Sequence, residues 1–228
     1  MEPNTTNTNG KKIAMWIGVV IAVLLVVWGC YKVVSKGLDN GGQQKTVVLD
    51  TAPALGANEH MKGNPNAKVT IIEYSDFECP ACRAYAPLFG EILQTYGDKV
   101  RVVYRHFPLP QHPSARLAVH FAEAAAKQGK FWEMHDILFA NQETWSLKPT
   151  EAKQTFLGYA ADLKLNITKL NADLAADDKA VEAMIDDSIR GGNILGVDRT
   201  PSIYINNIRV IDPQMIKATL DEQVAKTN

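Results

Sequence analysis

The chain has 228 residues and a formal net charge of −1, with 46% hydrophobic and 21% charged side chains. This length is sufficient for one domain with a substantial core, and the balanced charge, with no basic run, excludes nucleic acid as an expected partner. Much of the hydrophobic content lies near the N-terminus, so that region is expected to occupy a different environment from the rest.

The N-terminal region is predicted to be a short polar tail over residues 1–12 and a transmembrane anchor over residues 13–34. No charged side chain occurs from Ile13 to Tyr31, and about 20 apolar helical residues at about 1.5 Å each span a hydrocarbon core of about 30 Å. Trp16 and Trp28 lie near the two ends of this stretch, where aromatic side chains favour the membrane interface. A stretch that is apolar on all sides does not fit a half-buried helix of a soluble domain.

Two alternatives to a permanent anchor stay open. An apolar region of this length also occurs in cleaved export signals. The sequence Val27-Trp-Gly-Cys30 resembles a bacterial lipobox, in which Cys30 would be lipidated and become the mature N-terminus. Lysines occur on both sides of the stretch, so the distribution of positive charge does not fix its orientation.

Residues 35–60 are predicted to be a linker with an N-terminal strand, and residues 61–228 to be the main domain. The linker begins with a glycine- and glutamine-rich segment, as in flexible tethers, and Lys45–Leu49 is expected to be a short strand. Thr51–Asn66 is predicted to be a loop because prolines, glycines and asparagines interrupt it. Val69–Tyr74 is apolar and β-branched, which predicts a buried strand.

Two cysteines follow this strand at the start of a predicted helix, in the sequence Cys79-Pro80-Ala81-Cys82. The first turn of a helix has amide groups without intrahelical partners and the positive end of the macrodipole. Cys79 is therefore predicted to be the exposed nucleophile with a lowered pKa, and Pro80 suits the first helical position. Cys82 lies one turn deeper and is predicted to be the buried resolving thiol. Pro80 and Ala81 would form the turn that supports the thiolate.

Other interpretations of a Cys-x-x-Cys pair are a zinc site and an inert disulfide. A structural zinc site needs four ligands, but the only further cysteine is Cys30, and the five histidines are scattered without a zinc-like spacing. A redox pair without a bound metal is therefore the preferred hypothesis.

The remaining elements are predicted from periodicity and from prolines and glycines. The helix that begins at Cys79 is expected to reach Tyr96, with a kink at Pro87. The later predicted elements are a strand Val100–Tyr104, a loop His106–Pro113, helices Ser114–Gln128 (with Ser114 as its N-cap), Lys130–Asn141, Pro149–Leu163, Thr168–Asp177 and Lys179–Leu195, strands Ser202–Asn206 and Arg209–Ile211 joined at Asn206-Asn207, and a helix Pro213–Ala225. Four aromatic residues are expected to form the core of the helical region rather than a substrate site: Phe131, Trp132, Phe139 and Trp145.

Four stretches resemble the bacterial DsbA-like thiol:disulfide oxidoreductases, a branch of the thioredoxin superfamily. They are residues 63–69, 69–82, 129–139 and 196–206, and the resemblance extends over about residues 60–225. It implies an α/β thioredoxin-like fold with an inserted helical subdomain at about residues 114–195, preceded by the single N-terminal transmembrane helix.

The resemblance also implies roles for residues beside the dithiol. DsbA-like proteins have an acidic residue at the position of Glu73, so this carboxylate is expected beneath the dithiol, where it would exchange a proton with Cys82. The alternative is a carboxylate that faces solvent at the strand end. Thioredoxin-like folds place a cis-proline against the Cys-x-x-Cys helix, which implies a cis bond between Thr200 and Pro201. The backbone of Thr200 would then pair with an extended client chain.

The histidines of the loop after the second strand are further candidates. In a thioredoxin topology this loop lies near the dithiol, so that His106 or His112 could stabilise a thiolate. A surface or helix-capping role is the expected one for both.

The function implied is that of an extracytoplasmic thiol:disulfide oxidoreductase that introduces disulfides into exported proteins through Cys79 and Cys82. The expected partners are reduced exported proteins and a membrane protein that reoxidises the dithiol, with no cofactor. Because disulfides persist outside the reducing cytosol, the catalytic domain is expected on the outer side of the cell membrane, held by one membrane pass.

Two alternative functions stay open. One is a reductase or isomerase of the same superfamily, because the intervening Pro-Ala differs from the Pro-His of the best-known oxidases. The other is a metal-binding or metallochaperone module that uses Cys79, Cys82 and a nearby histidine.

Overall fold

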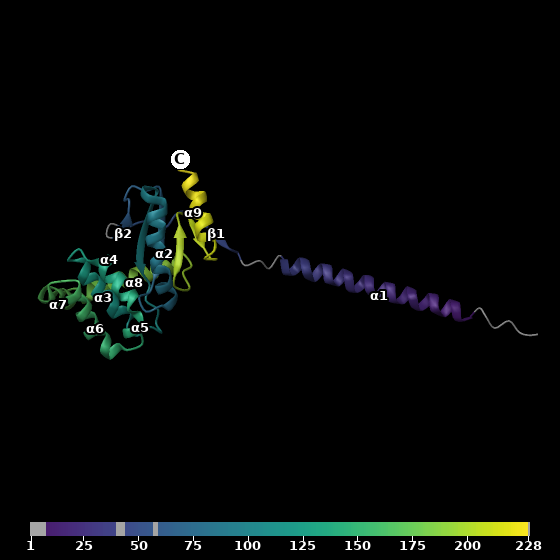
Figure 1. Cartoon of the computed structure of the whole chain (residues 1–228), viewed down its shortest axis with the longest axis horizontal. Helices are drawn as coiled ribbons and strands as arrows, with labels where there is room; N and C mark the ends of the chain where they lie inside the picture. Colours follow the sequence, from purple (N-terminus) through teal and green to yellow (C-terminus); the bar gives the residue numbers. More distant parts are fainter. Residues whose placement is uncertain (1–7, 40–43, 57–58, 228) are drawn as a thin grey trace, which may run out of the picture. The chain divides into compact units, whose positions relative to one another are not determined.

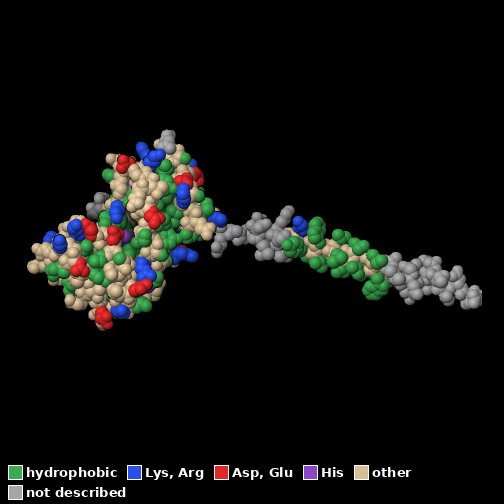
Figure 2. Space-filling model, in the orientation of Figure 1, with side chains coloured by type: hydrophobic (Ala, Val, Ile, Leu, Met, Phe, Trp, Pro, Cys, Tyr) green, Lys and Arg blue, Asp and Glu red, His purple; other side chains and the backbone are tan. Residues whose placement is uncertain are grey.

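A computed structural model of the chain describes residues 8–39, 44–56 and 59–227 (Figure 1). It divides into two units, residues 1–45 and 46–228. The first unit contains one long helix, α1 (Thr8–Asp39), and Figure 2 shows mostly hydrophobic side chains over the part of it that is drawn in colour. The window Met15–Lys32 has a mean hydropathy of 2.0 and buries none of its length inside the protein. By length and composition, α1 fits a membrane anchor.

The helix extends beyond the predicted anchor at both ends. It includes residues 8–12 of the predicted tail and residues 35–39 of the predicted linker, because adding residues to an existing helix costs little compared with starting one. Residues 1–7 of the tail and residues 40–43 and 57–58 of the linker lie outside the described residues.

The second unit is built on a six-stranded sheet with the order β1-β6-β5-β3-β4-β2. The neighbours β3 and β4 are parallel, and the other neighbouring pairs are antiparallel. The strands are β1 (Thr46–Val48), β2 (His60–Gly63), β3 (Val69–Ser75), β4 (Val100–His106), β5 (Ser202–Ile205) and β6 (Ile208–Val210). A helix between β3 and β4 supplies the crossover that parallel strands require.

One strand replaces part of a predicted loop. β2 lies within the segment Thr51–Asn66 and pairs with β4, with His60 opposite Tyr104. Its sequence His-Met-Lys-Gly has no apolar alternation, because a strand at the edge of a sheet exposes much of its surface. The pairing places His60 beside the residues that end β4.

The helices form two groups. Outside the insertion, α2 (Pro80–Tyr96), the 3₁₀ turn η1 (Gly97–Lys99) and α9 (Met215–Ala225) accompany the sheet. Between β4 and β5 the chain forms α3 (Ala115–Ala126), α4 (Phe131–Ala140), α5 (Gln142–Trp145), α6 (Pro149–Asp162), α7 (Ile167–Ala176) and α8 (Asp178–Ile194), which gather on one side of the sheet in Figure 1. The short helix α5 was not predicted, since a single turn has no periodicity to detect.

Alternation along β3 separates two sheet-facing cores. Ile71 packs in a cluster with residues of α2 and α9, whereas Ile72 and Tyr74 pack in a second cluster with Phe107 and Val197.

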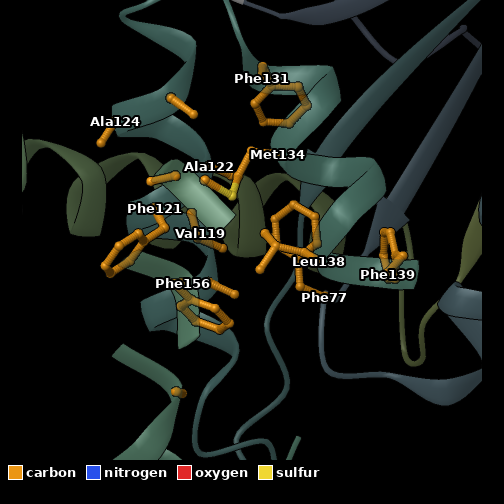
Figure 3. Packing of buried hydrophobic residues seen from close by; sticks show 14 of the residues in the cluster. Phe77, Val119, Phe121, Ala122, Ala124, Phe131, Met134, Leu138, Phe139 and Phe156 are labelled. Carbon is orange, nitrogen blue, oxygen red and sulfur yellow. The ribbon is translucent and has the colours of Figure 1, made fainter. Parts of the chain in front are cut away.

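A third core lies within the inserted helices (Figure 3), where the Phe121 and Phe156 rings are 5.3 Å apart. Phe131, Phe139 and Trp145 are buried in it and Trp132 packs against it, which confirms their predicted core role. The same core includes Phe77, Cys79 and Cys82, so the insertion packs directly against the dithiol.

Candidate active site

The dithiol lies where β3 passes into α2. β3 ends at Ser75, residues 76–79 form the turn, and Cys79 is the N-cap of α2, with φ −76° and ψ 121°. Its backbone N–H donates to the Asp76 carbonyl at 3.0 Å. Pro80 begins the helix, where its missing N–H costs nothing.

The two sulfurs differ in accessibility, and both residues are free cysteines in the structure. Cys79 is 6% exposed and Cys82 is 0% exposed. The prediction of an exposed Cys79 was therefore wrong in degree: the residue is buried except for a small area, because the Thr200 loop and the inserted helices pack around it. Cys79 nevertheless remains the more accessible of the two residues.

The pKa of the Cys79 thiol is lowered to about 5. The hydrogen bond from the Cys82 thiol is the largest cause, and it prevails over burial, which acts in the opposite direction. The Thr200 hydroxyl and the backbone N–H groups of Cys82 and Ala81 lower the pKa further. The amides of the first turn and the neighbouring thiol thus stabilise a Cys79 thiolate.

Cys82 is shifted in the opposite direction. Burial is the main cause that raises the pKa of this thiol, followed by the hydrogen bond to Cys79 and by the negative charge of Glu73. Cys82 consequently keeps its proton while Cys79 loses one. The Cys82 thiol stabilises the Cys79 thiolate, and the Cys79 thiolate in turn stabilises the protonated form of Cys82.

Glu73 lies on β3 and is 1% exposed. Burial raises the pKa of its carboxyl group to about 8, against a lowering by the Ser75 hydroxyl, and the charge of Cys79 raises it further. The Glu73 side chain also lines a cavity of about 450 Å³ between α2 and α4. Glu73 is therefore a buried group that gains or loses a proton near neutral pH, and the alternative of a solvent-facing carboxylate was wrong.

The Thr200–Pro201 peptide bond is cis, as predicted. The Thr200 carbonyl accepts a hydrogen bond from the Cys79 sulfur at 3.5 Å. β5, which starts directly after Pro201, pairs antiparallel with β3 and places Ile203 opposite Glu73. This pairing brings the Thr200–Pro201 segment alongside the dithiol.

Gln142, the first residue of α5, holds the active-site turn from the inserted helices. Its side-chain amide donates to the carbonyl oxygens of Phe77 at 2.8 Å and Cys79 at 2.9 Å, and the residue is 2% exposed. Sequence reasoning did not identify Gln142, because one glutamine far along the chain from the dithiol carries no pattern.

Two buried carboxylates of the turn itself also hold the active-site turn in place, and the sequence reasoning missed them. Glu78 accepts from the backbone N–H groups of Ser114 at 2.7 Å and Leu147 at 2.5 Å. Asp76 accepts from the backbone of Glu78 and of Leu109, each at 2.7 Å. Acidic residues this close to the cysteines were the available signal in the sequence.

The bond to Glu78 also changes the role of Ser114. Ser114 is the N-cap residue of α3, but its side chain makes no capping hydrogen bond and its hydroxyl oxygen is buried without a partner among the described residues. The predicted N-cap position is confirmed, but the hydroxyl does not cap the helix, and the backbone N–H of this buried residue donates to Glu78 instead.

The two candidate histidines are bound to carboxylates rather than to the thiolate. His112 Nδ1 lies 2.7 Å from Asp76 Oδ2. His106 Nε2 lies 2.8 Å from Glu123 Oε1, and burial lowers the pKa of His106, so its ring is neutral at pH 7. His106 is 3% exposed, so the expectation of a surface or capping role was wrong for this residue.

The alternative of a metal site at the cysteines has no geometric support. In the part of the chain that the structure describes, the side chains that converge as potential metal ligands are His60, His106 and Glu123, a set without either cysteine. The contact that the structure gives the Cys79 sulfur is with the Thr200 carbonyl at 3.5 Å.

A protein-family model described as thioredoxin (Thioredoxin_4) matches residues 56–224. The chain belongs to the thioredoxin family. A solved thioredoxin-like oxidoreductase from Silicibacter pomeroyi is 27% identical, with a TM-score of 0.62 over 76% of this chain and 95% of that one. Oxidised BdbD from Bacillus subtilis superposes with a TM-score of 0.66 at 22% identity, over 78% of this chain and 98% of BdbD. The fold of this thioredoxin-family chain is thus DsbA-like, with the inserted helices in place.

The curated relatives are longer proteins. Na⁺/H⁺ antiporter NhaA 3 of Salinispora tropica is 39% identical over 178 residues, which are 78% of this chain and 26% of that protein. The chain spans about a quarter to a third of the length of the first curated relatives it matches. The similarity therefore concerns one part of each antiporter protein.

Proposed function

We propose that this thioredoxin-family chain is a thiol:disulfide oxidoreductase that introduces disulfides into exported proteins. The observation that carries the proposal is the opposite shift of the two thiols: the pKa of Cys79 is lowered to about 5, while that of Cys82 is raised. A stabilised Cys79 thiolate is a good leaving group, and it favours the reduced form of the pair, so the disulfide form is an oxidant.

The reaction begins with a disulfide between Cys79 and Cys82. A client thiolate attacks the Cys79 sulfur, a mixed disulfide forms, and Cys82 leaves and takes a proton. A second client thiolate then attacks the client sulfur of the mixed disulfide and expels the Cys79 thiolate. The client gains one disulfide and loses two electrons, which remain on the Cys79/Cys82 dithiol.

Residues beside the dithiol support these steps. Glu73, with a pKa of about 8, is the proposed acid and base that gives a proton to Cys82 and takes it back. The Thr200–Pro201 segment, whose carbonyl reaches the Cys79 sulfur, is proposed to pair with the client backbone as a strand would. Because Cys79 is only 6% exposed, a client can reach its sulfur over a small area of the surface.

The proposed location follows from the chemistry of the product. Disulfides are stable outside the reducing cytosol, and α1 fits a membrane anchor, so we place the thioredoxin-fold unit on the extracytoplasmic side. The proposed partners are reduced exported proteins and a membrane protein that removes the two electrons from the dithiol. Antiport is a property of the longer relatives as whole proteins and is not extended to this chain.

Trapping of the mixed disulfide tests this function in cells. A Cys82→Ser variant removes the resolving thiol, so exported proteins should accumulate as disulfide adducts of Cys79 that disappear on reduction. The matched control Cys79→Ser keeps the buried thiol and should trap no clients. Equal adducts in both variants, or adducts confined to cytosolic proteins, would refute the proposed function or its location.

A further inference from the structure

The cluster of His60, His106 and Glu123 combines residues from three elements. His60 belongs to β2, His106 ends β4, and Glu123 lies on α3. His60 Nε2 is 2.5 Å and His106 Nε2 is 2.8 Å from the same atom, Glu123 Oε1. All three ligand atoms lie within 4.8 Å of one another. Two imidazole nitrogens and one carboxylate oxygen therefore converge on one point.

We propose that His60, His106 and Glu123 bind one divalent transition-metal ion of the zinc class. Two imidazoles and a carboxylate are ligands typical of Zn²⁺ sites. Ca²⁺ and Mg²⁺ are poor occupants, because they prefer six or more oxygen ligands and this site offers two nitrogens. The site is separate from the dithiol, whose cysteines are not part of the cluster.

The spacing of the ligand atoms fits an ion after a small movement. Tetrahedral bonds of about 2.0–2.1 Å place the ligand atoms about 3.3 Å apart. Glu123 Oε1 must then move about half an ångström away from His106 and somewhat further from His60. Rotation about the side-chain torsions of Glu123 and His60 supplies this movement, since their side chains are 16% and 17% exposed.

Both the burial and the open side of the cluster suit an ion with three protein ligands. The His106 side chain is 4% exposed and fixes the inner ligand, and its Nδ1 is buried without a partner among the described residues. The proton can therefore move to Nδ1 when Nε2 binds the metal, without breaking another hydrogen bond. On the outer side, His60 and His106 line a cavity of about 420 Å³ that also contacts Glu59 and Ser188, where water can provide a fourth ligand.

The packing of the rings shows what the ion would connect. His60 stacks on Phe131 of α4, with ring centroids 3.4 Å apart, and the His106 ring lies 5.7 Å from that of Phe77 in the active-site turn. A bound ion would join the edge strand β2 to the inserted helices close to this turn. We infer a structural role, in which metal binding stabilises the folded protein against local opening of β2.

The test uses the full chain in detergent with Cys79 and Cys82 oxidised to a disulfide, so that the dithiol cannot bind metal. Calorimetric titration with Zn²⁺ should show one site per chain, and Zn²⁺ should raise the melting temperature. Co²⁺ should give the visible bands of a tetrahedral nitrogen and oxygen site, without the intense near-ultraviolet band of a cobalt–thiolate bond. The His60→Ala variant, which alters a partly exposed residue, should lower the affinity by at least the roughly 10- to 100-fold that loss of an outer-shell partner causes, and Glu123→Gln should do the same.

The matched control is His120→Gln, because His120 lies on the same helix as Glu123 but is paired with Glu182 at 2.8 Å. This variant should bind Zn²⁺ like the unchanged protein, and circular dichroism should show that all variants are folded. Absence of Zn²⁺ binding by the oxidised chain would overturn the proposal. Equal affinity in the His60 variant, or binding by the reduced chain alone, would overturn it as well.

Discussion

The unfolding free energy of a Glu73→Gln variant, measured relative to that of the unchanged chain, should be higher at neutral pH than at acidic pH. The folded carboxyl group has a pKa of about 8, compared with 4.5 for an ordinary glutamate. Between these two values the folded state holds a proton that the unfolded state releases. The unchanged protein therefore loses stability as the pH rises from about 4.5 to about 8, and the Glu73→Gln variant lacks this loss.

The size of the effect follows from the linkage between protonation and folding. Each pH unit within that window costs about 1.4 kcal/mol. Between pH 5 and pH 7, the difference in unfolding free energy between the Glu73→Gln variant and the unchanged chain should grow by about 2 to 3 kcal/mol. Comparing two pH values cancels the pH-independent cost of burying an amide in place of a carboxyl group.

Urea denaturation of the reduced chain in detergent, followed by tryptophan fluorescence, measures this difference. Trp145 is fully buried, so its emission reports the loss of the core. Glu91→Gln is the matched control, since Glu91 is an exposed carboxylate of the same protein, on α2. If the advantage of the Glu73→Gln variant were the same at pH 5 and pH 7, Glu73 would be ionised in the folded protein, and its proposed proton transfer with Cys82 would be wrong.

Three further predictions concern the dithiol and its supports. In the reduced protein, the absorbance of the Cys79 thiolate at 240 nm should appear with a midpoint near pH 5. A Cys79→Ser variant should lack this transition. A midpoint above pH 8 would contradict the lowered pKa of Cys79. Gln142→Leu should remove the side-chain hydrogen bonds to the Phe77 and Cys79 carbonyls, of which the Cys79 carbonyl keeps the Arg83 backbone N–H as a partner, and it should cost about 1 to 3 kcal/mol of stability. It should also change the glutathione equilibrium, which a purely structural loss elsewhere would not. Gly192→Ala provides that comparison: its new Cβ would lie 2.7 Å from Phe107, so thermal melting should show a loss of about 1 to 3 kcal/mol, with the glutathione equilibrium unchanged.

The strands and helices around the dithiol could be predicted because their signals are local. Val69–Ser75 is apolar and β-branched, which favours a strand. Pro80 favours the start of a helix after Cys79, because proline suits the first helical position and this preference involves only the first turn of backbone. The inserted helices were predicted close to their observed ends for the same reason, since amphipathic periodicity extends over many residues.

The features that were missed depend on contacts between distant parts of the chain. β2 becomes a strand because β4 is available as its partner, and its own sequence carries no alternation. Gln142 acts on the turn of Cys79 across 63 residues of sequence, and His60 meets Glu123 across the same separation. Such pairs follow from tertiary packing and have no motif.

The burial of Cys79 has a similar origin. A cysteine at the N-terminus of a helix was expected to be exposed, but the Thr200 segment and the inserted helices reduce its exposed fraction to 6%. The backbone around the thiol was predictable from local sequence, whereas residues that contact Cys79, such as Thr200 and Gln142, lie more than 60 positions away.

The equilibrium between the Cys79/Cys82 pair and glutathione is the most direct measurement of the central claim. The full chain is incubated in buffers with different ratios of reduced to oxidised glutathione, and the fraction of dithiol is determined by alkylation. A thiolate stabilised as strongly as that of Cys79 predicts a potential between about −120 and −200 mV, the range of strong oxidants and isomerases. A value near −270 mV, as in thioredoxin, would contradict the oxidase function and assign the chain to the reductases.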